Sequence, residues 1–142
     1  MRDLITTNKL NVPTDQKLEA LVSQVYLPAD RMPFHGVDHP REVWREAQHI
    51  AGRCIANGIV VNVGALRDSS YLHDALLHVD PRLLGFDSPE ALSGCIGANF
   101  ERLQGRGEES ARRVNAITMA THWKSEPKTV EEKIIRAADL SN

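Results

Sequence analysis

The sequence has only two cysteines, few aromatic residues and no long hydrophobic run. Cys54 and Cys95 lie far apart, without a CxxC pair or the spacing of a metal-binding cluster, and both fall at apolar helical positions. We therefore interpret them as reduced core residues rather than as a disulfide. The N-terminal segment MRDLITTNKLNV lacks the apolar core of a secretory signal, and no stretch approaches the roughly 18 apolar residues of a membrane span. These absences predict a cytoplasmic protein without a membrane partner.

A charge excess of either sign is also missing. Seventeen Lys and Arg residues against nineteen Asp and Glu residues leave a formal net charge of −2. This balance provides no overall attraction for nucleic acid, so we expect no nucleic-acid polymer as a partner, although a local basic pocket is compatible with it. The 142 residues, 42% hydrophobic and 25% charged, suffice for one domain spanning residues 1–142 and are too few for two.

Hydrophobic residues recur with a helical period in almost every segment, and the one strand-like run, at residues 59–61, is too short to outweigh this pattern. The sequence therefore predicts an all-α bundle of about six helices. The expected helices lie at about 14–27, 40–56, 63–77, 88–104, 108–121 and 129–139. Residues 78–89, HVDPRLLGFDSP, contain two prolines and a glycine and are expected to form a loop.

Local signals refine these boundaries. Pro40 fits the first position of the second helix, which makes Asp38 or His39 its cap. The other signals are a cap at Thr14 or Asp15 and a stop at Pro28 for the first helix, the Asn57-Gly58 stop of the second, Ser88-Pro89 opening the fourth, and a Thr129–Glu132 capping box for the last. The residues expected to face inward are Val43, Ala47, Ile50, Ala51, Cys54 and Ile55 in the second helix, Leu92, Cys95, Ile96, Phe100 and Leu103 in the fourth, and Ala111, Val114, Ile117 and Thr121 in the fifth.

The segment YLHDALLH places His73 and Asp74 inside an apolar run. Burying either polar group without a partner costs roughly 2–7 kcal/mol. Neighbouring helical residues point about 100° apart, so both side chains reach one point only if it lies beside the helix. A divalent ion there would satisfy both, and a mixed imidazole–carboxylate set suits Zn, Mn, Fe, Co or Ni better than Ca. Taken singly, such residues are more simply a hydrogen-bonded histidine and a solvated aspartate.

The order His39, then His73-Asp74, then Asp139 resembles the HD-domain superfamily of metal-dependent phosphohydrolases. The segments FHGVDHPREVWREAQHIA and ATHWKSEPKTVEEKIIRAADLSN extend the resemblance over about residues 30–142, and AADLSN is also similar to a stretch of the cyclic-nucleotide phosphodiesterases. The resemblance implies a helical bundle in which these four residues hold a divalent metal ion, whether Mn, Co, Ni, Fe, Zn or Mg. One tightly held ion is the default, since only four ligands match the motif.

The activity that the resemblance implies is hydrolysis of a nucleotide or another small phosphate ester or anhydride through metal-bound hydroxide, with Asp74 as a catalytic residue. His35, four residues before His39, is implied as an acid toward the leaving group. His122 is a candidate additional metal ligand, as in dinuclear HD proteins, or a contact for the substrate phosphate, and Lys124 is a candidate phosphate contact; the alternative for both is a solvated loop residue. Glu90 is implied as an acidic residue that contacts the metal-bound water.

Two other functions are compatible with the same residues. A di-iron oxygenase of the HD fold would need further histidines between His73 and Asp139, and His78 and His122 are the candidates. A non-catalytic module that binds a nucleotide would keep the fold but would be expected to have lost a ligand. Because the chain ends three residues after Asp139, we also expect packing, metal binding, a homodimer or a longer parent protein to hold this ligand in place.

Overall fold

The computed structural model describes residues 16–22, 24, 38–76 and 79–141. Residues 16–22 and 24 are helical, and the further elements are α2 (Asp38–Ala56), α3 (Val63–Leu72), the 3₁₀ helix η1 (Pro81–Leu84), α4 (Pro89–Leu103), α5 (Gly107–Met119) and α6 (Val130–Leu140). No strand occurs in these ranges, which confirms the prediction of an all-α protein. Within the same ranges, no helix is long and apolar enough to cross a membrane.

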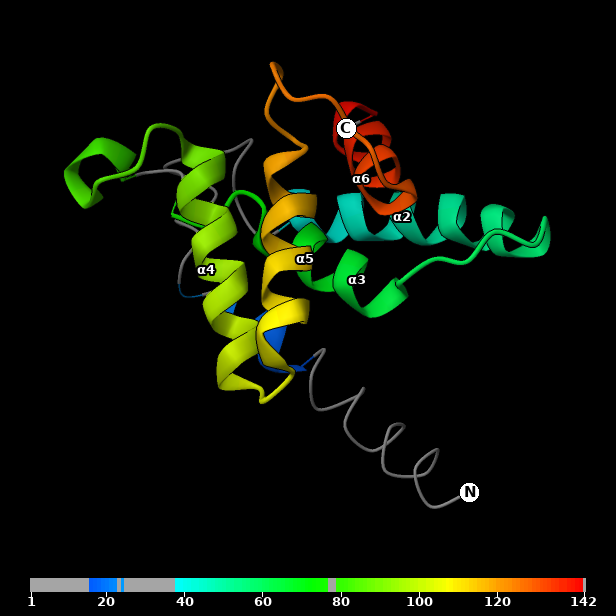
Figure 1. Ribbon diagram of the computed structural model, residues 1–142, viewed down its shortest axis with the longest axis horizontal. Coiled ribbons are helices and arrows are strands. Elements are labelled where there is room, and N and C mark those ends of the chain that lie inside the picture. The colour runs from blue at the N-terminus through cyan, green and yellow to red at the C-terminus, as the bar shows by residue number, and fades with distance from the viewer. Residues whose placement is uncertain (1–15, 23, 25–37, 77–78, 142) are drawn as a thin grey trace.

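The helix α3 lies at the centre of the arrangement. It contacts α2, α4, α5 and α6, and eight of its ten residues are buried. In Figure 1, α4 and α5 stand side by side as a pair, α2 and α3 run across them, and α6 lies against α2. Any residue at the C-terminal end of α3 is therefore close to several other elements at once.

The helices α4 and α5 pack closely because glycines face the partner helix. A Cβ atom on Gly97 would lie 2.8 Å from Cγ1 of Val114, and one on Gly94 would clash with the side chain of Asn115. Gly97 thus faces Val114, and Gly94 faces Asn115, so the two helices run antiparallel. The first turn of α4 therefore faces the C-terminal end of α5.

Two apolar clusters form the core. The first joins α2, α3, α5 and α6, and the second joins the N-terminal helical segment to the end of α3 and to α4; Trp44 packs against both. The members of the first cluster are Val43, Ala47, Ala51, Ala65, Leu66, Val114, Ile117, Ala120, Ile134, Ile135 and Ala138. Those of the second are Leu18, Val22, Tyr71, Leu72, Ala75 and Phe100. The two clusters hold the ends of α2, α3 and α6 in fixed relative positions.

Several local predictions are confirmed. Ser88 caps α4 by accepting a hydrogen bond from the backbone nitrogen of Ala91, with Pro89 as the first helical residue. Thr129 caps α6 by accepting one from the backbone nitrogen of Glu132, and α2 ends before Asn57. The predicted cap at Thr14 or Asp15 and the stop at Pro28 lie outside the described residues. Cys54 and Cys95 are partly buried and form no disulfide.

The prediction that a third helix continues to Leu77 is wrong, because α3 ends at Leu72. Residues 73–76 form a turn in which Leu76 has a φ of 56°, a left-handed conformation that cannot continue a helix. His73 and Asp74 therefore lie in the turn rather than inside the helix. The expected loop before Ser88 also contains the short helix η1.

Three smaller differences concern helix ends and exposed faces. The helix α2 already begins at Asp38, so Pro40 is its third residue, where the missing N–H group is still tolerated. The helix α5 ends at Met119, two residues early. Leu103 and Ile55 are 84% and 50% exposed instead of inward-facing, because each lies at the end of a helix, beyond the elements that cover the rest of it.

Candidate metal centre

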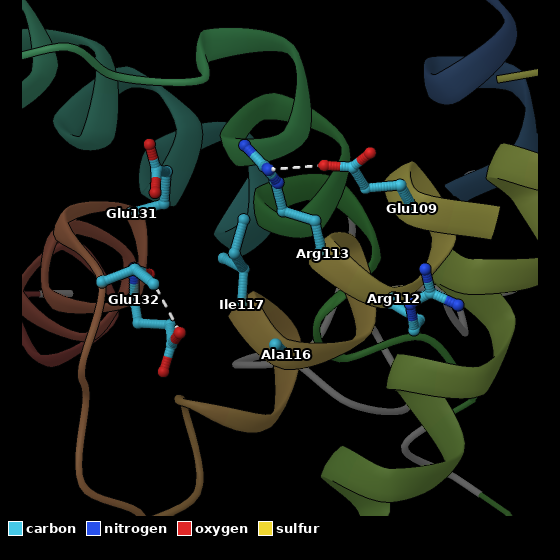
Figure 2. Close-up of a pocket in the computed structure, with 8 residues that line it drawn as sticks. Glu109, Arg112, Arg113, Ala116, Ile117, Glu131 and Glu132 are labelled. Carbon is cyan, nitrogen blue, oxygen red and sulfur yellow. Dashed lines mark hydrogen bonds and ion pairs between the residues drawn. The ribbon is translucent and has the colours of Figure 1, made fainter. Parts of the chain in front are cut away.

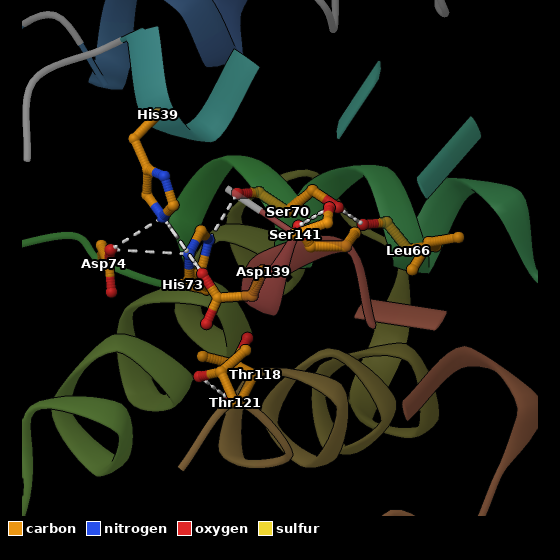
Figure 3. Close-up of polar contacts among 10 residues, drawn as sticks. His39, Leu66, Ser70, His73, Asp74, Thr118, Thr121, Asp139 and Ser141 are labelled. Carbon is orange, nitrogen blue, oxygen red and sulfur yellow. Dashed lines mark hydrogen bonds and ion pairs between the residues drawn. The ribbon is translucent and has the colours of Figure 1, made fainter. Parts of the chain in front are cut away.

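Three elements that are distant in sequence bring four polar side chains to one point (Figure 3). His39 is the second residue of α2, His73 and Asp74 follow α3, and Asp139 is the penultimate residue of α6. His73 is separated from His39 by 34 residues and from Asp139 by 66. The structure thus places together the four residues predicted as metal ligands.

The two histidine nitrogens lie close to one another and to both carboxylates. Nε2 of His73 lies 3.3 Å from Nε2 of His39. Oδ1 of Asp139 lies 3.1 Å from Nε2 of His39 and 3.2 Å from Nε2 of His73. Oδ2 of Asp74 lies 3.4 Å from Nε2 of His39 and 3.5 Å from that of His73. Ligands at about 2.0–2.2 Å from one tetrahedral ion would be roughly 3.3–3.6 Å apart. The group therefore has the size of a single cation's ligand shell.

The ring of His73 is oriented for this role by a backbone carbonyl. Its Nδ1 lies 2.7 Å from the carbonyl oxygen of Ser70, and because a carbonyl only accepts, Nδ1 must donate. In the neutral ring, Nε2 then carries the lone pair and faces the other three side chains. A hydrogen bond to the second ring nitrogen is what fixes the tautomer of metal-binding histidines.

The electrostatics of the centre favour a positive charge. Burial by itself lowers the pKa of His73, but the carboxylates of Asp74 and Asp139 outweigh it and raise this pKa to about 9. For Asp139 the directions are reversed: burial by itself raises its pKa, but the neighbouring His39 and His73 hold this pKa far below its usual range. These opposite shifts mean that the two carboxylates attract a cation, either a proton or a metal ion, to the space between the rings.

Two buried side-chain oxygen atoms have no hydrogen-bond partner among the described residues: Oε2 of Glu90 in α4 and Oγ1 of Thr118 in α5. The α4–α5 register places Glu90 opposite the end of α5, which carries Thr118. The hydroxyl of Ser93 donates to the carbonyl of Ala75 at 3.0 Å and ties the same part of α4 to the turn that carries Asp74. A centre formed by two imidazoles and two carboxylates fits a divalent cation.

The other predicted site residues have different outcomes. His35 and His78 lie outside the described residues. His122 and Lys124 lie in the loop between α5 and α6, where Nδ1 of His122 accepts a hydrogen bond from the backbone nitrogen of Lys124 at 3.1 Å. The group of described residues that could hold a metal contains His39, His73 and Asp74, with Asp139 in hydrogen-bond contact, and does not include His122.

Two contributors were missed in the sequence. Ser70 acts through its backbone carbonyl, which no residue type signals. Arg136 binds the loop that carries His122, through hydrogen bonds to the carbonyl oxygens of His122 and Trp123 at 3.3 and 3.0 Å. The position of an arginine three residues before Asp139 is the only signal that could have indicated it.

Two surface hollows are not lined by His39, His73, Asp74 or Asp139. A hollow of about 380 Å³ between α5 and the start of α6 is lined by residues of both charges and by none of the four candidate ligands (Figure 2). Another, of about 450 Å³, lies along α4 and α5 and includes Phe86, Ala91, Cys95 and Met119. Neither hollow concentrates charge of one sign, so the centre of His39, His73, Asp74 and Asp139 is the better candidate for chemistry.

Comparison of the chain with protein-family models, with curated proteins and with solved structures found no match.

Proposed function

We propose that this protein is a metal-dependent phosphohydrolase that acts on a nucleotide or another small phosphate ester or anhydride. The observation that carries the proposal is that the Nε2 atoms of His39 and His73 lie 3.3 Å apart and each lies 3.1–3.5 Å from a carboxylate oxygen of Asp74 and one of Asp139. The resemblance of their order in the sequence to the HD-domain phosphohydrolases supports the same activity and an HD-type bundle.

The four side chains would hold the ion, and their identity suits a hydrolytic role. A bound divalent ion lowers the pKa of water toward neutrality and neutralises charge on a phosphoryl oxygen. His73 contributes a ring fixed by Ser70, and Asp74 and Asp139 contribute negative charge that retains the cation. A rigid, preoriented ligand set of this kind keeps its geometry through the reaction.

Glu90 is assigned to the water that attacks phosphorus. Its buried Oε2 has no hydrogen-bond partner in the described part of the chain and lies in the turn of α4 that is tied to Ala75. In the proposed reaction, the water oxygen forms a bond to phosphorus, the bond from phosphorus to the leaving oxygen breaks, and Glu90 accepts the proton that the water loses.

The loop between α5 and α6 supplies contacts for the substrate phosphate. Nδ1 of His122 accepts a hydrogen bond from the backbone, so the neutral ring carries its hydrogen on Nε2 and can donate it to a phosphate oxygen. Lys124 adds an exposed positive charge in the same loop. An oxygenase would instead need more histidine ligands, but Nδ1 of His122 accepts a hydrogen bond, so in the neutral ring its Nε2 carries the hydrogen and has no lone pair for a metal ion. We therefore rank hydrolysis first.

The test is elemental analysis of the purified protein and of Asp74→Ala, combined with phosphate release from a nucleotide panel with added Mn, Co, Ni or Mg. We expect about one metal ion per chain and turnover in the native protein, and loss of both in the variant. Asp87→Ala, which changes an exposed aspartate before α4, is the matched control and should keep both. Two irons without phosphate release would favour the oxygenase, and absence of metal from the native protein would refute the proposal.

A further inference from the structure

The loop of residues 121–125 presents an exposed indole on a fixed backbone. Trp123 is 74% exposed, although it is one of the largest apolar side chains. Arg136 holds the loop by donating to the carbonyl oxygens of Ser125 at 2.6 Å, Trp123 at 3.0 Å and His122 at 3.3 Å. The indole is therefore exposed on a loop whose backbone is held in place by hydrogen bonds.

This loop lies next to the candidate metal centre. Arg136 and Asp139 are three residues apart on α6, which is about 4.5 Å along the helix axis and brings their side chains to adjacent positions. At the start of the loop, the Thr121 hydroxyl donates to the carbonyl oxygen of Thr118 at 2.8 Å, and Figure 3 draws both threonines beside Asp139. One turn of α6 thus contributes a candidate ligand and anchors the indole.

The side chains around the indole are suited to a phosphate compound. Nζ of Lys124 lies 4.9 Å from the centroid of the Trp123 ring, in the geometry of a cation–π contact. The His122 ring is within 19° of parallel to the indole, with the centroids 6.1 Å apart, and its Nε2 carries a hydrogen in the neutral ring. An aromatic face, a cation and a hydrogen-bond donor therefore occupy one side of the centre.

We propose that Trp123 is the platform on which the base of a nucleotide substrate stacks, so that the nucleotide's phosphate lies toward Lys124, His122 and the metal centre. This inference rests on the proposed phosphohydrolase function and specifies its substrate class. Every base has a π-face, so the platform recognises the presence of a base more than its identity. Lys124, which is exposed, moves from the indole face to the phosphate when the base arrives. Arg136 acts as a positioning residue.

The test uses the fluorescence of Trp123 in Trp44→Phe, which leaves one tryptophan in the chain. Metal-loaded protein is titrated with the four ribonucleoside 5′-monophosphates and with ribose 5-phosphate, which lacks a base. We expect all four nucleotides to quench the emission and to bind about tenfold or more tightly than ribose 5-phosphate. Because Trp123→Ala and Trp123→Phe lack the indole reporter, their binding is measured by isothermal titration calorimetry; Trp123→Ala should reduce the preference about fivefold or more, whereas Trp123→Phe should retain most of it.

Arg136→Lys tests the positioning role, because lysine cannot reproduce the forked hydrogen bonds of a guanidinium. We expect the preference for nucleotide over ribose 5-phosphate to fall, mainly through KM, while the metal content stays that of the native protein. Arg112→Lys, on the exposed face of α5, is the matched control. A merely structural role of Arg136 would lower Tm without changing the preference.

The failure of this inference is distinguishable from failure of the proposed function. If the native protein hydrolyses ribose 5-phosphate and nucleotides equally well, or if Trp123→Ala leaves the preference unchanged, the base platform is refuted and the phosphohydrolase stands. If nucleotides quench Trp123 but no metal is bound and no phosphate is released, the platform stands in a nucleotide-binding module. Preference for nucleotides that depends on Trp123, together with turnover, supports both.

Discussion

In the first turn of α4, the Glu90 carboxylate has one oxygen that is buried and has no hydrogen-bond partner among the described residues. Leaving such an atom unpaired costs about 1–3 kcal/mol, so its retention is better explained by a bound water than by packing. We expect Glu90→Gln to lower kcat about 10²- to 10⁴-fold, since an amide cannot accept a proton from water. Steady-state kinetics would measure the effect.

The metal content separates this role from that of the four ligands. Glu90→Gln should bind as much metal as the native protein, and Glu126→Gln, in an exposed loop, should leave kcat unchanged. Loss of metal from Glu90→Gln, or an unaltered kcat, would contradict the assignment of Glu90 to the attacking water.

Leu76 lies in the turn that carries His73 and Asp74. A φ of 56° is rare for a bulky residue and costs on the order of 1–2 kcal/mol. This conformation prevents the chain from continuing as a helix through residue 76. Backbone strain of this kind persists only where the surrounding contacts hold it.

At the scale of the elements, the closeness of α4 and α5 determines where Glu90 and the loop after α5 are placed. Gly97→Ala would put a Cβ atom 2.8 Å from Cγ1 of the fully buried Val114. We expect it to destabilise the protein by about 1–3 kcal/mol, as overpacking does, and to reduce activity by moving the first turn of α4. Chemical denaturation measures the free energy of unfolding.

Gly52 is a matched control for this prediction. It lies in α2, and a Cβ atom there would meet nothing within 4 Å. Gly52→Ala should therefore stabilise the protein by about 0.5–1 kcal/mol, because alanine is the better helix former. The same chemical change thus has opposite expected signs at the two positions. A stabilising Gly97→Ala would show that the helices separate without cost.

The buried charges of α3, α4 and α5 affect the molecule as a whole. Glu101 is 1% exposed and accepts hydrogen bonds from Arg106 and Ser110, both at 2.8 Å. Arg106 also pairs with Asp68, which is fully buried and bonded to Arg67 at 3.0 Å. Burial and the neighbouring Asp68 carboxylate raise the pKa of Glu101 to about 7, although Ser110 and Arg106 lower it.

This raised pKa predicts a pH dependence of stability. The folded protein holds the Glu101 proton more tightly than the unfolded chain, whose glutamate has a pKa near 4.5. The resulting contribution to the free energy of unfolding is fully present below about pH 4.5 and is lost as the pH rises through about 7. Denaturation curves between these pH values should show a loss of stability that is smaller in Glu101→Gln. An equal pH dependence in the two proteins would contradict the prediction.

The sequence by itself determined the helical class and several helix ends, because these depend on interactions within one turn of the chain. Ser88 and Thr129 cap their helices through nitrogens three residues away, and the apolar period of α2 and α5 marks their buried faces. The four candidate ligands were also named from the sequence. That prediction came from the resemblance of their order to a known family, since no local rule brings His39 and Asp139 together.

Only the tertiary structure decided how these groups meet. The end of α3 at Leu72 and the left-handed conformation of Leu76 follow no signal in the sequence, and the convergence of His39, His73 and Asp139 depends on packing between residues 34 and 66 positions apart. The anchoring of the loop by Arg136 and the buried state of Glu101 are likewise products of long-range contacts. Helical periodicity and capping depend on residues that are close in sequence, whereas the site depends on packing between helices that are far apart in sequence.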